Sequence, residues 1–237
     1  MDPTVFGLDW LRRRMAAGDR VTRRLTEGVF WTVLGNLCSS DSTLLASIVV
    51  ARTLGASDYG ALGIIQSSLS TFLVFGGASL GTTGTKYIAE LKNSDPERAG
   101  RILRLTLGTA YVLSGGITIL LLLASPAFAG RALAAPHLAP HIRLAAITLF
   151  LTGVNGAQIG ALAGFEAFRS IAKINIARGL LTVPLLWAGA QLYGLKGAVI
   201  GLGVVSAVAA IMSGVIVRRC SREAKLARSG RRAWKEA

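Results

Sequence analysis

The sequence predicts an all-α, polytopic membrane protein with six transmembrane helices, on three observations. Its 237 residues are 52% hydrophobic and only 16% charged, whereas soluble domains are about 25% charged. Six stretches have the roughly 20 mostly apolar residues that a helix needs to cross a bilayer. Lysines and arginines, 26 against 12 acidic residues, gather in alternate connections between these stretches. Because a soluble basic protein would expose this apolar surface, a soluble enzyme or a nucleic-acid partner is not expected.

Each predicted span is a continuous, largely apolar run without the alternation of β strands. The first is FWTVLGNLCSSDSTLLASIVV, the second is ALGIIQSSLSTFLVFGGASL, and the third includes GGITILLLLASPAF. The fourth is rich in Ala, Leu and Gly, the fifth contains GLLTVPLLWAGAQLY, and the sixth is GAVIGLGVVSAVAAIMSGVIV. The predicted boundaries are 30–50, 61–80, 102–128, 142–164, 174–193 and 197–217.

Positive charge predicts how these spans are oriented. Of the 26 lysines and arginines, 22 lie before the first span, in the second and fourth connections, and in the tail. The other connections hold four, namely Arg52, Arg131, Arg143 and Lys196. Because lysine and arginine concentrate in cytoplasmic loops, both termini are predicted to be cytoplasmic, in the plasma (inner) membrane.

Three regions follow from this arrangement. Residues 1–28 form a basic, amphipathic segment that either lies along the headgroups as an interfacial helix or forms a solvated arm. Residues 29–218 form the six-helix lobe, and residues 219–237 form a basic cytoplasmic tail.

Polar groups inside the spans are the candidates for a substrate pathway or for ion coupling. Asp41 lies about ten residues beyond Trp31, which is about 15 Å along a helix and near the centre of a ~30 Å hydrocarbon core. Such a carboxylate should face a cavity, be protonated or meet a cation, or it is a packed structural acid. Asn36 points about 140° away from it, so both cannot face one narrow cavity. The full candidate set is Asp41, Asn36, Arg52, Gln66, Asn155, Gln158 and Arg178.

Other sequence features concern packing and chemistry. Gly156, Gly160 and Gly164 recur every four residues, which predicts close helix contact. Arg178 either snorkels to the surface or presents its forked donors to an anionic headgroup, and Arg52 is a second such candidate. No catalytic motif, metal-ligand cluster or cofactor motif is recognised, so neither catalysis nor a cofactor is expected.

Four segments resemble a known family, in order and at matching spacing along about residues 28 to 220. They are ARTLGASDYGALG (51–63), TKYIAELKNSDPERAGRIL (85–103), LAGFEAFRSIAKINIARGL (162–180) and YGLKGAVIGL (193–202). The family resembled is the O-antigen and polysaccharide flippases of the Wzx/RfbX type, in the multidrug/oligosaccharidyl-lipid/polysaccharide exporter superfamily.

The resemblance implies transport of an undecaprenyl-diphosphate-linked oligosaccharide from the inner to the outer leaflet. It also implies two six-helix lobes that rock around a central cavity, and the six predicted spans resemble the amino-terminal lobe. Implied partners are the lipid-linked oligosaccharide, membrane lipids, and a second six-helix lobe or a second copy. A cation-coupled small-molecule exporter of the same superfamily, or an inactive truncated or scaffold membrane protein, are the alternative functions.

Overall fold

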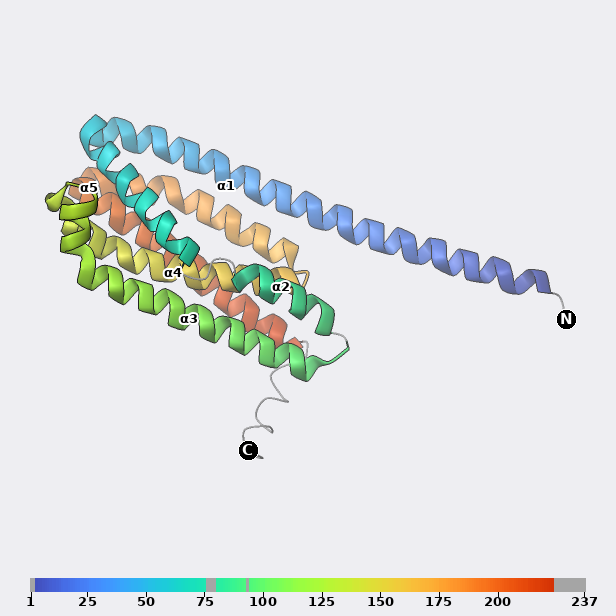
Figure 1. The fold of residues 1–237 in the computed structure, drawn as a ribbon. Coiled ribbons are helices and arrows are strands. Elements are labelled where there is room, and N and C mark those ends of the chain that lie inside the picture. The colour runs from blue at the N-terminus through green and yellow to red at the C-terminus, as the bar shows by residue number, and fades with distance from the viewer. Residues whose placement is uncertain (1–2, 76–79, 93, 224–237) are drawn as a thin grey trace, which may run out of the picture.

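The protein is helical throughout the part that the computed structural model describes, which is residues 3–75, 80–92 and 94–223. Five α-helices are joined by short connections, and the connection between α3 and α4 contains a π-helical turn and a 3-10 turn (Figure 1). In order, the elements are α1 (Pro3–Phe75), α2 (Leu80–Leu91), α3 (Pro96–Ala127), η1 (Phe128–Ala132), η2 (Pro136–Leu138), α4 (Ala139–Gly164) and α5 (Phe168–Glu223).

Four of the described helical segments are long and apolar enough to cross a membrane, where the sequence predicts six spans. They are Phe30–Val74, Pro96–Arg131, Pro136–Gly164 and Phe168–Arg222. The third and fourth predicted spans fall within the second and third of these segments. The first segment has 45 residues, about 68 Å if straight, more than twice a ~30 Å hydrocarbon core.

Internal bends explain the two longest segments. Gly55 in α1 has φ 76° and ψ 173°, and Tyr193 and Gly194 in α5 also leave the helical conformation. The bend at Gly55 falls in the predicted connection 51–60, and the bend at Tyr193 and Gly194 spans the end of the predicted fifth span and the start of the connection that follows it. In Figure 1 the chain turns back at each bend. Each long helix therefore consists of two arms. The first arm of α1 is residues 3–54 and its second arm is 56–75, and the first arm of α5 is residues 168–192 and its second arm is 195–223. Six separate membrane crossings stay a prediction.

The helix α2 differs from the predicted layout. The sequence predicts a second span through residue 80 followed by a connection, whereas α1 ends at Phe75 and α2 covers Leu80–Leu91; residues 76–79 lie outside the described ranges. Tertiary packing accounts for this short helix, because Ile88 is completely buried and packs in a cluster with Leu162 and Ile174.

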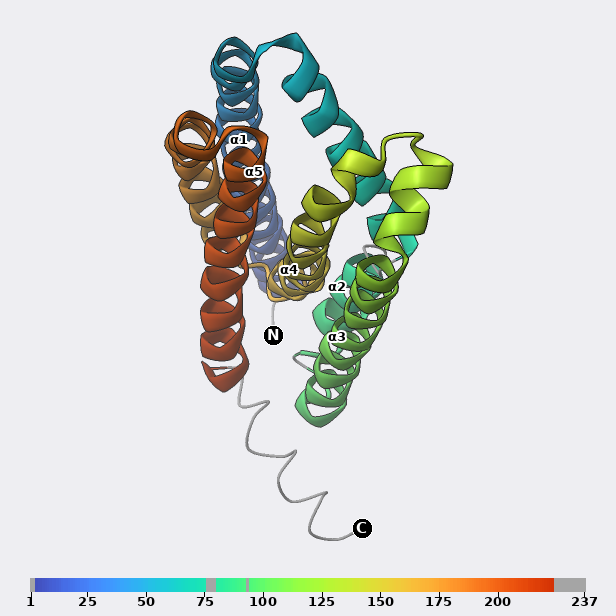
Figure 2. The ribbon, with the colours of Figure 1, turned by 90° about the vertical axis from the view of Figure 1, so that its left-hand side faces the viewer.

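The central element is α4, which lies between α5 on one side and α2 and α3 on the other (Figure 2). The most apolar 18-residue stretch of the segment Pro136–Gly164 is 61% buried, compared with 17% for the most apolar stretch of Phe30–Val74 in α1. One core cluster joins Ile142 and Leu149 to Ile65 of α1, and the other joins Leu162 to Ile88 of α2. Close van der Waals packing of these side chains holds the surrounding helices against α4.

The predicted glycine contact is present between α2 and α4. A Cβ at Gly160 would overlap the backbone of Gly81, and a Cβ at Gly164 would lie 2.8 Å from the Cβ of Ile88. Thr85 reinforces this approach by donating a 2.8 Å hydrogen bond to the carbonyl oxygen of Gly160. Small residues let the two backbones meet, as in many membrane helix pairs.

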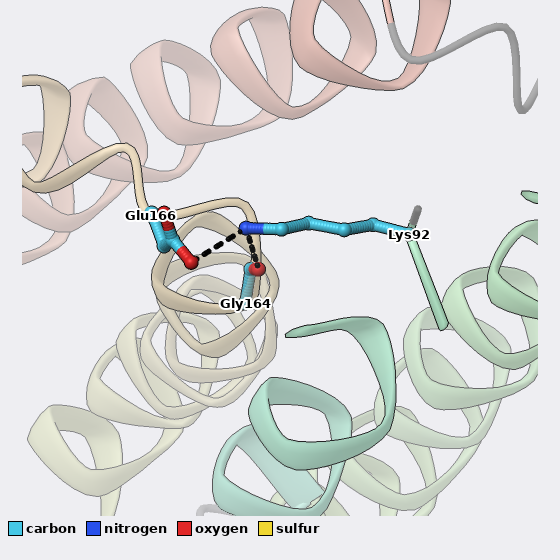
Figure 3. Close-up of polar contacts among 3 residues, drawn as sticks. All are labelled: Lys92, Gly164 and Glu166. Carbon is cyan, nitrogen blue, oxygen red and sulfur yellow. Dashed lines mark hydrogen bonds and ion pairs between the residues drawn. The ribbon is translucent and has the colours of Figure 1, made fainter. Parts of the chain in front are cut away.

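An ion pair joins the ends of the same two helices (Figure 3). Lys92 Nζ lies 2.9 Å from Glu166 Oε1 and donates a 3.4 Å hydrogen bond to the carbonyl oxygen of Gly164. Glu166 lies in the short turn between α4 and α5 and has φ 59°. Lys92 therefore contacts both the last carbonyl of α4 and the turn that follows it.

The three predicted regions are not separated in the secondary structure. The helix α1 begins at Pro3 and continues from the predicted amino-terminal segment into the first span without a break. At the other end, α5 continues to Glu223, and residues 224–237 of the predicted tail lie outside the described ranges. The three regions and the location of residues 1–28 stay predictions.

Candidate substrate cavity

A cavity of about 450 Å³ lies between the two arms of α1, helix α4 and both arms of α5. Apolar side chains such as Val50, Leu62 and Leu186 line part of its wall. The rest is polar and comes from all three helices: Ser39, Thr43, Ser47, Gln66, Ser70, Thr148, Thr152, Arg178, Thr182 and Ser206. This mixture suits a ligand that has both polar and apolar parts.

The hydroxyl groups of the first arm of α1 follow helical spacing. Ser39, Thr43 and Ser47 are four residues apart and share one face of the helix. Thr43 donates to the carbonyl oxygen of Ser39 at 2.8 Å, and Ser47 donates to that of Thr43 at 2.9 Å. Because each of these two hydroxyl protons is used within the helix, their oxygens remain available as acceptors.

Arg178 is the charged group of this cavity. It is half-buried in the first arm of α5, and its carbonyl oxygen accepts a 2.7 Å hydrogen bond from Thr182 Oγ1. No Asp or Glu is among the described lining residues, and no ion pair of Arg178 occurs in the described ranges. The guanidinium therefore gives this cavity a positive charge that no lining carboxylate neutralises.

The wall contributed by α4 and the second arm of α5 holds further hydrogen-bonding capacity. Thr148 Oγ1 is buried and has no hydrogen-bond partner among the described residues. One helical turn away, Thr152 Oγ1 donates to Ser206 Oγ at 3.4 Å. A buried hydroxyl without a partner is costly, so a polar ligand group that reaches Thr148 would gain a hydrogen bond.

Two of the seven predicted site residues, Gln66 and Arg178, line this cavity. Asp41 and Arg52 are exposed on α1 and are not among the lining residues. Asn36 is also exposed and outside the cavity, where its Oδ1 accepts a 3.3 Å hydrogen bond from Asn175 Nδ2. Neither Asn36 nor Asp41 lines this cavity, so which polar face of the first span lines a substrate pathway stays a prediction.

The two polar residues predicted on α4 lie elsewhere. Asn155 is 8% exposed, and its Oδ1 accepts a 2.7 Å hydrogen bond from Ser213 Oγ of α5. Gln158 is 5% exposed and lines a separate groove between α3, α4 and the second arm of α5. Asn155 therefore has a structural partner, and Gln158 belongs to a different surface.

Sequence reasoning missed several polar residues of the cavity: Ser39, Thr148, Thr152, Thr182 and Ser206. A signal for some of them is present, because Thr148 and Thr152, and likewise Arg178 and Thr182, are four residues apart within apolar spans. That spacing places each pair on one helix face. Within the described ranges, no three His, Cys, Asp or Glu side chains gather where they could hold a metal ion.

Comparison with known proteins identifies a similar solved structure and a matching protein family. A crystal structure of MATE in the straight conformation superimposes with a TM-score of 0.67 at 17% sequence identity, covering 81% of this chain and 44% of that chain. The two share a fold, and this chain spans less than half the length of the structure that it matches. No curated protein matches the sequence. The polysaccharide biosynthesis protein family matches residues 25–236. The chain is thus a multi-pass membrane protein with a MATE-like fold, and it belongs to the polysaccharide biosynthesis protein family.

Proposed function

We propose that this chain forms one lobe of a flippase for an undecaprenyl-diphosphate-linked oligosaccharide, moving it from the inner to the outer leaflet of the plasma (inner) membrane. The observation that carries the proposal is Arg178, a half-buried cation in a cavity whose described lining holds no carboxylate. A guanidinium binds phosphate oxygens through paired donors. Arg178 would therefore bind the diphosphate of the substrate.

The remaining polar wall supports the same function. A glycan that crosses hydrocarbon leaves its hydroxyl groups without hydrogen-bond partners, at a cost of several kcal/mol per group. The oxygens of Thr43 and Ser47, the amide of Gln66 and the unpartnered hydroxyl of Thr148 offer acceptors and donors in place of water. No covalent chemistry is needed, because the lobe only shields the headgroup while the lipid chain stays in the bilayer.

A second lobe would complete the pathway. The cavity of about 450 Å³ is the size of a small-molecule pocket and encloses only part of a lipid-linked oligosaccharide. This chain matches 44% of the MATE structure, which leaves more than half of that fold without a counterpart. A second six-helix lobe or a second copy of this chain would supply it, and rocking of the two lobes would open the cavity alternately.

Reconstitution tests the proposal directly. The full chain, alone and together with a candidate second lobe, is placed in proteoliposomes, and movement of a fluorescent lipid-linked oligosaccharide between leaflets is measured. Arg178→Gln should abolish movement, whereas Arg178→Lys should keep part of it because the charge remains. Lys173→Gln is the matched control, because Lys173 is exposed on the same arm of α5 and does not line the cavity.

Two results would overturn the proposal. One is the absence of movement in every combination although the protein is folded, which would favour a scaffold role. The other is equal movement by the wild type and Arg178→Gln. The exporter alternative relies on Asp41, which lies outside the cavity; loss of gradient-dependent efflux of a small cation in Asp41→Asn would favour it.

A further inference from the structure

We infer that the exposed face of the first arm of α1, around Asp41, docks an apolar transmembrane helix that carries a lysine or arginine near its centre. Such a helix belongs to the second lobe that the proposed function requires, and the assignment rests on that function. It adds which surface the second lobe covers, and that this lobe differs in sequence from the present chain.

An exposed apolar stripe runs along this arm, which lies at an edge of the bundle (Figure 1). Its residues are spaced so that they share one helix face. They are Phe30, Val33, Leu37, Leu44 and Ile48, and their exposed fractions are 50% to 64%. From Phe30 to Ile48 the stripe measures about 27 Å along the helix, most of a ~30 Å hydrocarbon core. Its length therefore matches a transmembrane helix as the partner.

Asp41 interrupts this stripe, four residues after Leu37 and three before Leu44. Its side chain is exposed and has no hydrogen bond or ion pair within the described ranges. Ser39 and Thr43 line the cavity, and each is about 160° around the helix from Asp41. The carboxylate therefore lies on the side of the arm that faces away from the cavity.

The structure places Asp41 near the middle of the membrane. The next residue, Ser42, meets α5 at Gly179, where a Cβ would lie 2.8 Å from Ser42 Oγ. Gly179 lies near the midpoint of the first arm of α5, about 15–20 Å from either end. A carboxylate that faces hydrocarbon at this depth is costly, and such groups pair with another group in the membrane. Lipid headgroups are too far away to supply a cation.

The charge of Asp41 indicates what covers this face. Two copies in a symmetric dimer present the same surface to each other, and both have the same orientation in the membrane. Asp41 would then meet Asp41 at equal depth, and like charges in an interface are unfavourable. Arg178 is at a similar depth but lines the cavity. A helix of different sequence, with one cation among apolar residues, covers the stripe and pairs with the carboxylate.

Binding of model helices tests this surface. The full chain is reconstituted in phosphatidylcholine vesicles with leucine–alanine transmembrane peptides whose central residue is lysine, leucine or aspartate, and energy transfer between labels measures association. The wild type should bind the lysine peptide about tenfold more tightly than the leucine peptide, the effect of one charge-assisted hydrogen bond, and the aspartate peptide no better than the leucine peptide. Leu44→benzoylphenylalanine should cross-link to the lysine peptide, whereas Val112→benzoylphenylalanine, at an exposed position of α3, should not.

Variants identify the group responsible. Asp41→Asn should remove the preference for the lysine peptide, and Asp41→Glu should keep it. Asp58→Asn is the matched control and should also keep it, because Asp58 is exposed on α1 but lies beyond the bend at Gly55.

Three results would overturn the inference. They are equal binding of the three peptides by the wild type, a lysine preference that survives in Asp41→Asn, and stronger cross-linking of Leu44→benzoylphenylalanine to a second copy than to the lysine peptide, which would assign the face to self-association. The assay contains no glycan, so these failures are distinguishable from a failure of lipid-linked oligosaccharide movement in the Arg178 experiments.

Discussion

The side chains of Ser213 and Asn155 join α5 to α4 in the protein interior, where Ser213 Oγ donates a 2.7 Å hydrogen bond to Asn155 Oδ1. Ser213 is completely buried and Asn155 is 8% exposed. The same hydroxyl also lies 2.8 Å from the carbonyl oxygen of Ala209, so Ser213 links its own helix to α4.

Removing this hydroxyl should weaken the packing of the two helices. Ser213→Ala leaves Asn155 Oδ1 without its partner and should lower the free energy of unfolding by about 0.6–1.7 kcal/mol, the range for interhelical hydrogen bonds in membranes. Unfolding in mixed micelles by increasing SDS measures the change. Ser67→Ala is the control, because Ser67 is exposed and donates only within its own helix. Equal stability of both variants would show that the Ser213–Asn155 bond is energetically neutral.

The glycine contact between α2 and α4 should tolerate no side chain. Gly160→Val places three carbons against the backbone of Gly81 and should destabilise the chain by about 1–3 kcal/mol through overpacking. Gly108→Ala, in an open part of α3, should instead be neutral or stabilising by up to about 1 kcal/mol. Thermal unfolding followed by circular dichroism compares them. A Gly160→Val variant as stable as the wild type would contradict this packing.

The bend in α1 should require Gly55. Its φ of 76° and ψ of 173° lie in a region that is essentially restricted to glycine and costs other residues about 1–3 kcal/mol, so Gly55→Ala should lower stability by that amount and straighten the turn between the arms. A pair of spin labels, one on each arm, would report a longer distance between them. Gly60→Ala, at an open helical position without positive φ, should leave the distance unchanged. An unchanged distance in Gly55→Ala would show that packing alone maintains the bend.

Six membrane crossings predict which connections face which side. After Cys38 and Cys220 are replaced by alanine, a single cysteine at Ser57 or Lys196 should react with an impermeant maleimide from the outer side. A cysteine at Ser94 should react only from the cytoplasmic side, and all three positions are exposed. Labelling of Ser57 and Ser94 from the same side would rule out a crossing by the second arm of α1.

Much of the fold follows from local sequence. The capping of α3 illustrates why: Asp95 accepts a 3.0 Å hydrogen bond from the backbone N–H of Arg98, and Pro96 occupies the first turn, a pattern readable within four residues. The bend at Gly55 falls within the predicted 51–60 connection for the same reason. The helix α2 was not predicted, because it depends on Ile88 and Gly81 meeting α4 more than 70 residues away.

The cavity was predictable only in part. Arg178 and Gln66 stand out in the sequence as polar groups inside apolar spans. Asp41 stands out even more strongly, yet its side chain is exposed on α1. Whether a helix face is buried or exposed depends on which other helices pack against it, and the sequence of α1 does not show this. Asn155 looked equally available and is instead hydrogen-bonded to Ser213, 58 residues further along the chain.

The sequence by itself determined that the chain is an all-α membrane protein, because the length of an apolar run and the charge between runs are local properties that govern insertion into a bilayer. The tertiary structure alone decided which polar groups share a cavity. Those groups come from α1, α4 and α5, and only packing settles whether a polar side chain finds a partner, as Asn155 does, or faces a cavity without a carboxylate, as Arg178 does.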